Sequence, residues 1–316
     1  MSRAGGLIRA GTAAATAAAA TRVAYTVLNQ RPPGGTKTWS RTNHRGEPVT
    51  LLEGPAVAVG AVVGVLAQAA FGSPRPGAAM ALAGAGAAAF GGYDDLAGSG
   101  DRRGFRGHLG ALRHGEVTTG AVKLGGIGVT GIVSAVLAGG APVDVVIDAG
   151  LVAGGANLLN LFDLRPGRAI KVAVASGALI AAGGSVSGRR AGIAAPLAAA
   201  LILLPQDLGK RAMLGDCGAN SLGAMLGAAA AGLPRPARIA LLAGITGLTA
   251  VSEKVSFTKV IERTSALRWL DMLGRRPPQL MPKVLIPAQR CDMAKVNGAA
   301  TVLRSAENTD LAPPEE

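Results

Sequence analysis

The feature that most limits the fold of this chain is a series of apolar runs that recurs over its first 252 residues. Nine runs are visible, at 7–27, 55–72, 77–93, 121–141, 143–162, 169–184, 191–205, 212–232 and 237–252. A helix needs roughly 20 mainly apolar residues to cross a bilayer, and several of these runs are nearer to about 15. Only 16% of the residues are charged, below the roughly 25% of soluble domains. We therefore predict an all-α fold, a polytopic bundle of about nine transmembrane helices in a multi-pass cell-membrane protein.

The basic residues indicate the orientation, because Lys and Arg gather in cytoplasmic loops. If the loop after the first run is cytoplasmic, that side holds most of them: Arg31, Lys37, Arg41, Arg45, Arg102, Arg103, Arg106, Arg113, Lys123, Arg165, Arg168, Lys171, Lys210 and Arg211. The N-terminus is then outside and the C-terminal tail is cytoplasmic. We place the membrane domain at 1–260 and the tail at 261–316, partly disordered at its end. The first run also resembles a signal peptide, but eight further runs favour a membrane helix.

The net charge of +13 raises nucleic acid as a partner, since phosphate binding needs clustered Lys and Arg. Here the basic residues are spaced between apolar runs and aromatic residues are scarce, so we expect a lipid bilayer and no nucleic acid as partner. The two cysteines, Cys217 and Cys291, have no metal-like spacing. They indicate neither a disulfide nor a zinc site.

Two adjacent acids, Asp94 and Asp95, end the third apolar run in "GGYDDLAG". A helix C-terminus is partially negative, so each acid there costs roughly 0.3–1 kcal/mol unless a cation offsets it. Mg²⁺ is a candidate, because it takes one or two carboxylates together with phosphate oxygens. The alternative is a solvated loop that begins at Tyr93.

A second polar cluster, Asn157, Asn160 and Asp163, lies in "NLLNLFDLRPGR" at the end of the fifth run. Their spacing of three residues puts them on one stripe of a helix. Polar side chains in a membrane helix usually face a partner helix or a cavity. The stripe therefore indicates a binding pocket or, alternatively, hydrogen bonding between helices.

A third cluster surrounds Asp216 in "MLGDCGANSLG", at the start of the eighth run. The flanking Gly215 and Gly218 allow close approach to a ligand, and a helix N-terminus offers amide donors to phosphate. An ordinary helix-capping aspartate is the alternative. Together the three clusters fall on the cytoplasmic side beside basic loops, which predicts a phosphate-handling site with a divalent cation.

At these motifs the sequence resembles the polyprenyl-phosphate N-acetylhexosamine-1-phosphate transferase superfamily. "GGYDDLAG" is similar to its Asp-Asp motif, "NLLNLFDLRPG" to its Asn-x-x-Asn-x-x-Asp-Gly motif, and "LGDCGANSLG" to its Met-Gly-Asp-x-Gly-Ser motif. The loop "NHRGEPVTLLEGP" resembles its His-containing first cytoplasmic loop. The resemblance covers about residues 1–260. It implies transfer of a sugar-1-phosphate from a UDP-sugar to a polyprenyl phosphate, with release of UMP, in cell-envelope glycan (peptidoglycan) biosynthesis.

The resemblance also implies roles for individual residues and Mg²⁺ as cofactor, with Mn²⁺ as an alternative. Asp216 would be the main metal ligand, and Asp94 and Asp95 would bind metal or deprotonate the lipid phosphate. The candidate catalytic residues are thus Asp94, Asp95 and Asp163. The candidate substrate-binding residues are Asn157, Asn160, Lys123, His44 and Arg45; a plain interface anchor is the alternative for Lys123. Whether the protein forms a homodimer stays open.

The sequence also departs from the family pattern. Pro166 stands where the family has a second acid, Ala219 replaces the motif serine, and a tenth membrane helix is missing. These departures favour an alternative, a catalytically degenerate relative that binds a lipid phosphate or an envelope-assembly partner. A transporter ranks last, because the polar clusters lie at helix ends rather than at mid-membrane. The choice between direct attack and an aspartyl intermediate stays open.

Overall fold

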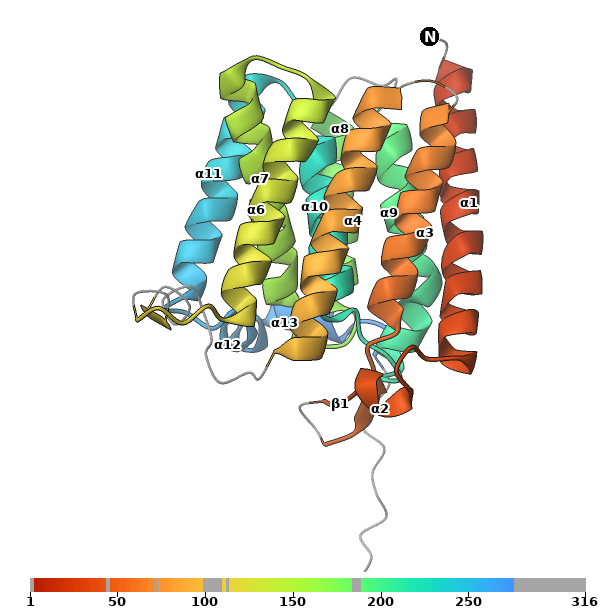
Figure 1. Ribbon diagram of the computed structural model, residues 1–316, viewed down its shortest axis with the longest axis vertical. Coiled ribbons are helices and arrows are strands. Elements are labelled where there is room, and N and C mark those ends of the chain that lie inside the picture. Colours follow the sequence, from red (N-terminus) through yellow and green to blue (C-terminus); the bar gives the residue numbers. More distant parts are fainter. Residues whose placement is uncertain are drawn as a thin grey trace, which may run out of the picture. The chain divides into compact units, whose positions relative to one another are not determined.

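The computed structural model describes residues 3–43, 46–70, 72, 74–98, 110–111, 114–183 and 189–275 (Figure 1). The chain divides into two compact units, Met1–Arg276 and Pro277–Glu316, and every described residue belongs to the first. The described chain is mostly helical, as predicted. The first unit extends past residue 260, and the predicted disorder at the end of the tail lies outside the described residues.

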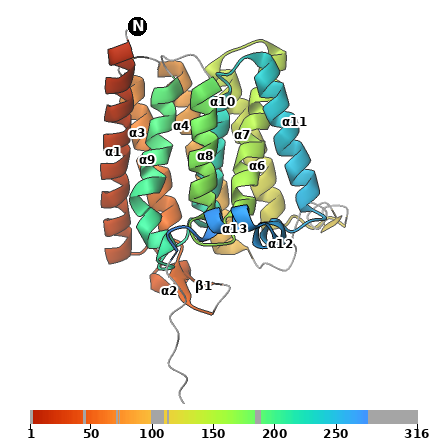
Figure 2. The same ribbon diagram turned by 180° about the vertical axis from the view of Figure 1, so that it is seen from behind.

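The long helices run up and down through the first unit (Figures 1 and 2). They are α1 (Arg3–Gln30), α3 (Glu53–Ala70), α4 (Pro74–Ala97), α6 (Thr119–Ala138), α7 (Pro142–Phe162), α8 (Arg168–Gly183), α9 (Arg189–Leu208), α10 (Gly215–Ala230) and α11 (Arg235–Ser252). Each predicted apolar run falls on one of them. Helix α10 is buried along almost its whole length and packs against α3, α4, α7, α8 and α9, so it forms the centre of the bundle.

By length and composition, three of the described helices could each cross a membrane: α3, α6 and α7. A fourth span results if α11 is counted with α12 (Phe257–Arg263), although this pair is bent by 92°. The other helices are either short, like the 16-residue α8 and α10, or rich in alanine, glycine and threonine. A membrane protein is thus indicated, whereas this measure does not reproduce the nine predicted spans.

One end of the bundle carries short elements that the sequence did not predict. Helix α2 (Thr36–Trp39) leads into a small antiparallel hairpin of β1 (Ser40–Thr42) and β2 (Pro48–Thr50). Thr50 accepts a hydrogen bond from Met213 N at 3.0 Å and donates to Arg211 O at 3.2 Å. The hairpin is therefore tied to the segment that enters α10.

Helices α12 and α13 (Ser265–Met272) lie at the same end of the unit (Figure 2). Arg168 donates to both carboxylate oxygens of Asp271, at 2.8 and 3.0 Å, and Lys171 Nζ donates to the Asp271 carbonyl at 2.8 Å. Arg275 donates to the Pro166 carbonyl at 2.8 Å. The segment that follows Asp163 thus holds α13 at this end of the bundle. We call this end, which carries the hairpin, α12 and α13, the foot of the bundle.

The opposite end of the unit holds a second ion-pair network. Asp144 and Asp148, in the first two turns of α7, are held in ion pairs rather than left to water. Arg238 donates to Asp148 at 2.7 Å and to Asp144 at 2.7 Å, and Arg235 also pairs with Asp144. Asp148 and Arg238 are buried, because the facing helices α7 and α11 each supply one partner. The sequence shows the two halves 90 residues apart, so their pairing needed the fold.

Candidate functional site

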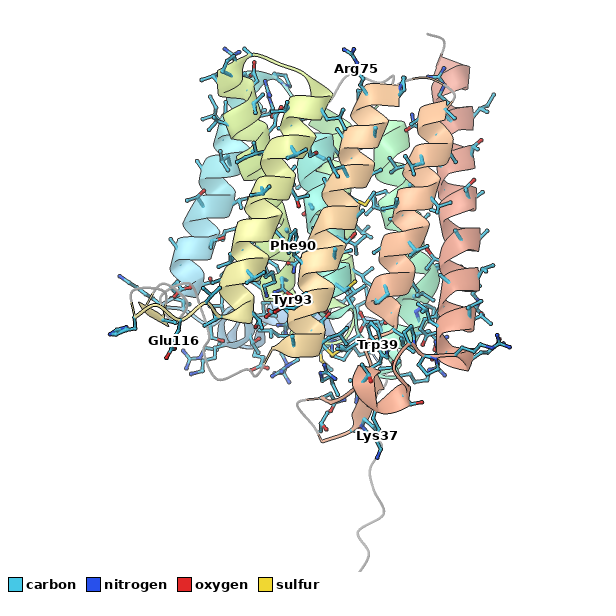
Figure 3. All side chains as sticks on the ribbon, in the orientation of Figure 1. Lys37, Trp39, Arg75, Phe90, Tyr93 and Glu116 are labelled. Atoms are coloured by element: carbon cyan, nitrogen blue, oxygen red, sulfur yellow. The ribbon has the colours of Figure 1, made fainter. Side chains whose placement is uncertain are left out.

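Three helix ends meet where the conspicuous acids of the sequence lie. Tyr93, the neighbour of Asp94, marks this lower end of α4 in Figure 3, whereas Arg75 marks the opposite end. Helix α4 approaches α10 closely at Gly91, where an added Cβ would lie only 2.3 Å from the Asp216 carbonyl oxygen. A glycine at this position therefore lets the end of α4 reach the start of α10.

Lys123, in the second turn of α6, joins the acids of the other two helices. Its ammonium lies 2.6 Å from Asp94 Oδ2 and also contacts Asp216 Oδ2. The side chains of Lys123, Asp94 and Asp216 are 14%, 17% and 25% exposed. One cation thus lies between two mostly shielded carboxylates.

Asp95 accepts hydrogen bonds from the backbone at the start of α10. Its Oδ1 accepts a hydrogen bond from Asp216 N at 3.0 Å, and its Oδ2 accepts one from Cys217 N at 2.8 Å. The first amides of a helix have no partner within the helix, so Asp95 caps α10 from a neighbouring helix. Gly215 has φ 60°, and a Cβ there would lie 2.9 Å from Asp95 Oδ2. Glycine is therefore required for this close contact.

Arg41 of β1 completes the arrangement from the hairpin. Its guanidinium donates to the main-chain carbonyl of Asp95 and thereby satisfies one of the free carbonyls at the end of α4. In the sequence Arg41 is one of several basic loop residues, and only the hairpin brings it to Asp95. The sequence by itself predicts for Arg41 only a place in a basic cytoplasmic loop.

Asp163 follows the last residue of α7 and lies within the interior at the same end. It is 8% exposed and accepts a hydrogen bond from the Gly215 backbone. Burial raises the pKa of the Asp163 carboxyl well above its usual range, and the nearby carboxylates of Asp207 and Asp216 act in the same direction. Asp163 therefore lies next to the start of α10, where Asp216 is, but it faces the interior of the bundle.

Two further acids near Asp163 were missed in the sequence. Glu53, the first residue of α3, and Asp207, near the end of α9, are 0% and 1% exposed. Both Glu53 oxygens, Asp163 Oδ2 and Asp207 Oδ2 lack a hydrogen-bond partner among the described residues. Glu53 and Asp207 are each a single acid at the edge of an apolar run, and such acids usually lie in water. This is why their sequence signal was weak.

Apart from Lys123, the predicted substrate-binding residues are less closely gathered. Asn157 donates to Thr249 Oγ1 of α11 at 3.4 Å, which agrees with the alternative of hydrogen bonding between helices. Asn160 is half-buried, and its carbonyl accepts from Asp163 N at 3.0 Å. His44 and Arg45 lie outside the described residues.

The described residues contain no group of three or more His, Cys, Asp or Glu side chains arranged to hold a metal ion. Asp94 and Asp216 nevertheless aim one carboxylate each at a single cationic group, the Lys123 ammonium. Mg²⁺ often uses one or two protein carboxylates and completes its shell with waters and substrate phosphates. The donor set therefore fits a magnesium ion held by two protein ligands, without Asp95.

Comparison with known proteins adds no further information about this site. The chain matches none of the models of known protein families, and no curated protein matches it in sequence.

Proposed function

We propose that this chain is a membrane enzyme that transfers a sugar-1-phosphate from a UDP-sugar to a polyprenyl phosphate and releases UMP. The reaction would take place at the cytoplasmic membrane face and serve the assembly of cell-envelope glycans. The observation that carries this proposal is the convergence of Asp94, Lys123 and Asp216 from three helices. Carboxylates and an ammonium at one point suit the binding of a metal-bound diphosphate.

The proposal includes an orientation for the bundle. About nine helices would be embedded in the membrane, with the N-terminus outside. The foot of the bundle, with the hairpin, α12 and α13, would then face the cytoplasm, where basic loops are expected. A site at a helix end suits an acceptor whose phosphate lies at the membrane surface and whose prenyl chain lies in the lipid.

In the proposed reaction an oxygen of the lipid phosphate attacks the β-phosphorus of the UDP-sugar. A new P–O bond forms, the bond from this phosphorus to the oxygen of the α-phosphate breaks, and UMP leaves with that oxygen. Asp94 and Asp216 would hold Mg²⁺, which when bound neutralises charge on the phosphate oxygens. Lys123 would bind a phosphate oxygen, and Asp95 would fix the start of α10. Positioning and charge neutralisation supply most of the catalysis in phosphoryl transfer.

A second candidate is a non-catalytic relative that binds a lipid phosphate or an assembly partner. The observation that favours it lies after Asp163, where Pro166 replaces the second acid of the family motif. The Pro166 carbonyl accepts from Arg275, and Arg168 pairs with Asp271. This segment is thus used to hold α13 at the foot of the bundle.

Release of UMP by the purified protein distinguishes the two candidates. The full chain in detergent would be supplied with Mg²⁺, polyprenyl phosphate and a panel of UDP-sugars, with Asp216→Asn as control. Release that needs the lipid, needs Mg²⁺ and is lost in the control supports the transferase. A folded protein that binds polyprenyl phosphate but releases no UMP with any sugar supports the non-catalytic relative.

A further inference from the structure

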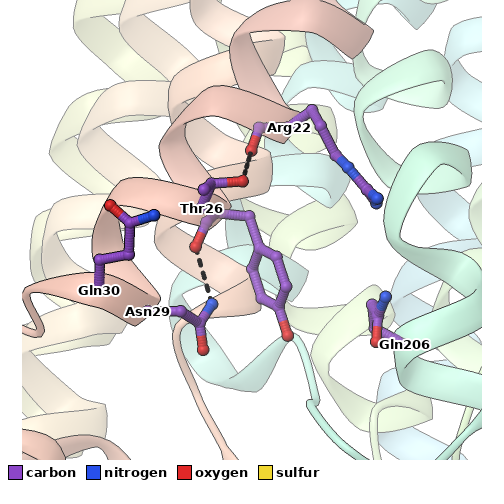
Figure 4. A pocket seen from close by; sticks show the side chains of 6 residues that line it. Arg22, Thr26, Asn29, Gln30 and Gln206 are labelled. Atoms are coloured by element: carbon purple, nitrogen blue, oxygen red, sulfur yellow. Dashed lines mark hydrogen bonds between the residues drawn. The ribbon is translucent and has the colours of Figure 1, made fainter.

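A polar pocket of about 330 Å³ lies between α1 and α9 (Figure 4). Its described lining consists of Arg22, Tyr25, Thr26, Asn29, Gln30 and Gln206. The first five share one face of α1 at helical spacing, and Gln206 faces them from α9. A pocket of this volume suits a small ligand or a head group.

The lining is rich in hydrogen-bond donors, and no carboxylate lines the described part of the pocket. Thr26 and Asn29 donate to the carbonyls of Arg22 and Tyr25, one turn earlier in α1. The Arg22 and Gln206 side chains border the remaining space in Figure 4, and Tyr25 also lines it. A positive charge beside neutral donors is the arrangement expected for an anion.

The position of the pocket along the bundle indicates which kind of anion it binds. Gln30 is the last residue of α1, and Gln206 lies two residues before the end of α9, so the pocket is at the foot of the bundle. On the neighbouring surface of α1, Val23 and Val27 are 63% and 52% exposed, as expected of side chains that face lipid. An exposed arginine inside such an apolar surface usually reaches for the lipid head groups.

We propose that this pocket binds the phosphate head group of an anionic phospholipid of the cytoplasmic leaflet. Arg22 supplies the charge, Tyr25 and Gln206 supply hydrogen bonds, and Val23 and Val27 contact the acyl chains. The site rests on the proposed membrane orientation but not on the transferase activity. Nearby charges outside the lining are Glu53, which is fully buried, and Arg211, which adds to the positive field at Tyr25.

The test is native mass spectrometry of the detergent-purified full chain, titrated with dioleoyl-phosphatidylglycerol and, separately, with dioleoyl-phosphatidylcholine. The matched variants are Arg22→Gln and Arg75→Gln, since Arg75 is an exposed arginine at the opposite end of the bundle. We expect tighter binding of the anionic lipid, weakened roughly fivefold or more by Arg22→Gln and unchanged by Arg75→Gln. Equal binding to Arg22→Gln, or equal weakening by both variants, would overturn the proposal.

Two competitors separate the sources of phosphate. Excess inorganic phosphate should leave the lipid bound, because it lacks the acyl chains; displacement would mean a site for free phosphate. Polyprenyl phosphate should likewise leave phosphatidylglycerol bound. If polyprenyl phosphate displaces phosphatidylglycerol from the wild type but not from the Arg22→Gln variant, the pocket binds the lipid acceptor. The proposed occupant is then wrong. These readouts involve no transfer activity, so a failed transferase assay does not affect them.

Discussion

The Lys123 ammonium lies 2.6 Å from the Asp94 carboxylate and also contacts Asp216, so one cation from α6 links acids from α4 and α10. Ion pairs of this kind add little stability when they are fully exposed, but loss of one partner is costly when they are shielded. These three side chains are mostly shielded, which makes the role of Lys123 measurable.

Replacement of Lys123 by methionine should leave two facing carboxylates without a cation. We expect a loss of roughly 2 kcal/mol in the free energy of unfolding, less than for a fully buried pair, because the side chains are partly exposed. Added Mg²⁺ should restore part of it by binding between the acids. Thermal unfolding in detergent, with and without Mg²⁺, measures both effects. The double variant Asp94→Asn/Lys123→Met is the control, and the same Mg²⁺ response there would contradict the explanation.

Asp95 should differ from Asp94 in its effect on stability. Asp95→Asn puts an amide NH₂ beside one of the two backbone N–H groups that the carboxylate now accepts, so the start of α10 loses a cap. We expect a cost of about 1 kcal/mol, typical of a lost cap. Asp94→Asn removes no capping bond but takes one of the two carboxylates from Lys123, so in the same thermal measurement it gives the effect of the lost charge without a lost cap. Unchanged unfolding of Asp95→Asn would show that the capping contact does not stabilise α10.

The docking of α13 should depend on pH. Burial alone would raise the pKa of the Asp271 carboxyl, but the Arg168 guanidinium, with Arg275, holds it below its ordinary value. A carboxyl whose pKa is lower in the docked state favours docking above its ordinary pKa of about 3.9. This contribution is lost as the pH falls through the lowered value. The protection of the amides of residues 265–272 against hydrogen exchange, taken relative to the intrinsic rate at each pH, should therefore be high at neutral pH and fall below about pH 4.

The variant Arg168→Gln provides the control for that experiment. It removes the main partner of Asp271, so the protection of the α13 amides should already be low at neutral pH and should change little on acidification. A pH response as large as that of the wild type would mean that another group controls the docking of α13.

At the opposite end, two arginines of α11 allow a matched comparison. Arg238 is 9% exposed and pairs with buried Asp148, whereas the side chain of Arg235 is 52% exposed. Arg238→Gln should lower the thermal midpoint by roughly 5 °C or more, because it leaves a shielded carboxylate without its guanidinium. Arg235→Gln should have a clearly smaller effect, since exposed pairs contribute little. Equal shifts would contradict the assignment of a shielded pair.

The apolar runs predict the long helices well. Helices that pack in this bundle consist mainly of small or apolar side chains, so each helix is visible in the sequence as an apolar run. The pairing of helix ends is less accessible to sequence reasoning. Asp94 and Asp216 stand out as acids beside apolar runs, but their convergence on Lys123 depends on Gly91, which admits α10 close to α4. The Asp-Asp pair suggests a metal-ligating role for Asp95, and the resemblance adds a role as base; both stay predictions. The capping of α10 by both oxygens of Asp95 became visible only in the fold.

Other features were missed for physical reasons. Glu53 and Asp207 are single acids, and nothing in their neighbours along the chain indicates that they become buried. The segment with α13 has many charges and prolines after it, so its helix appeared to be part of a tail. It is ordered at the foot of the bundle because Arg168 and Lys171, about 100 residues earlier, provide donors for Asp271.

The most direct test of the account is to look for the lipid product itself. Wild-type protein, Asp94→Asn and Asp216→Asn would be incubated with Mg²⁺, polyprenyl phosphate and UDP-sugars. The amount of lipid-linked sugar in the lipid fraction would then be measured by mass spectrometry. The account predicts a prenyl pyrophosphoryl sugar from the wild type and at least about a hundredfold less from both variants, although each variant still folds. Undiminished product from both folded variants would contradict the central claim that these carboxylates form the transferase site.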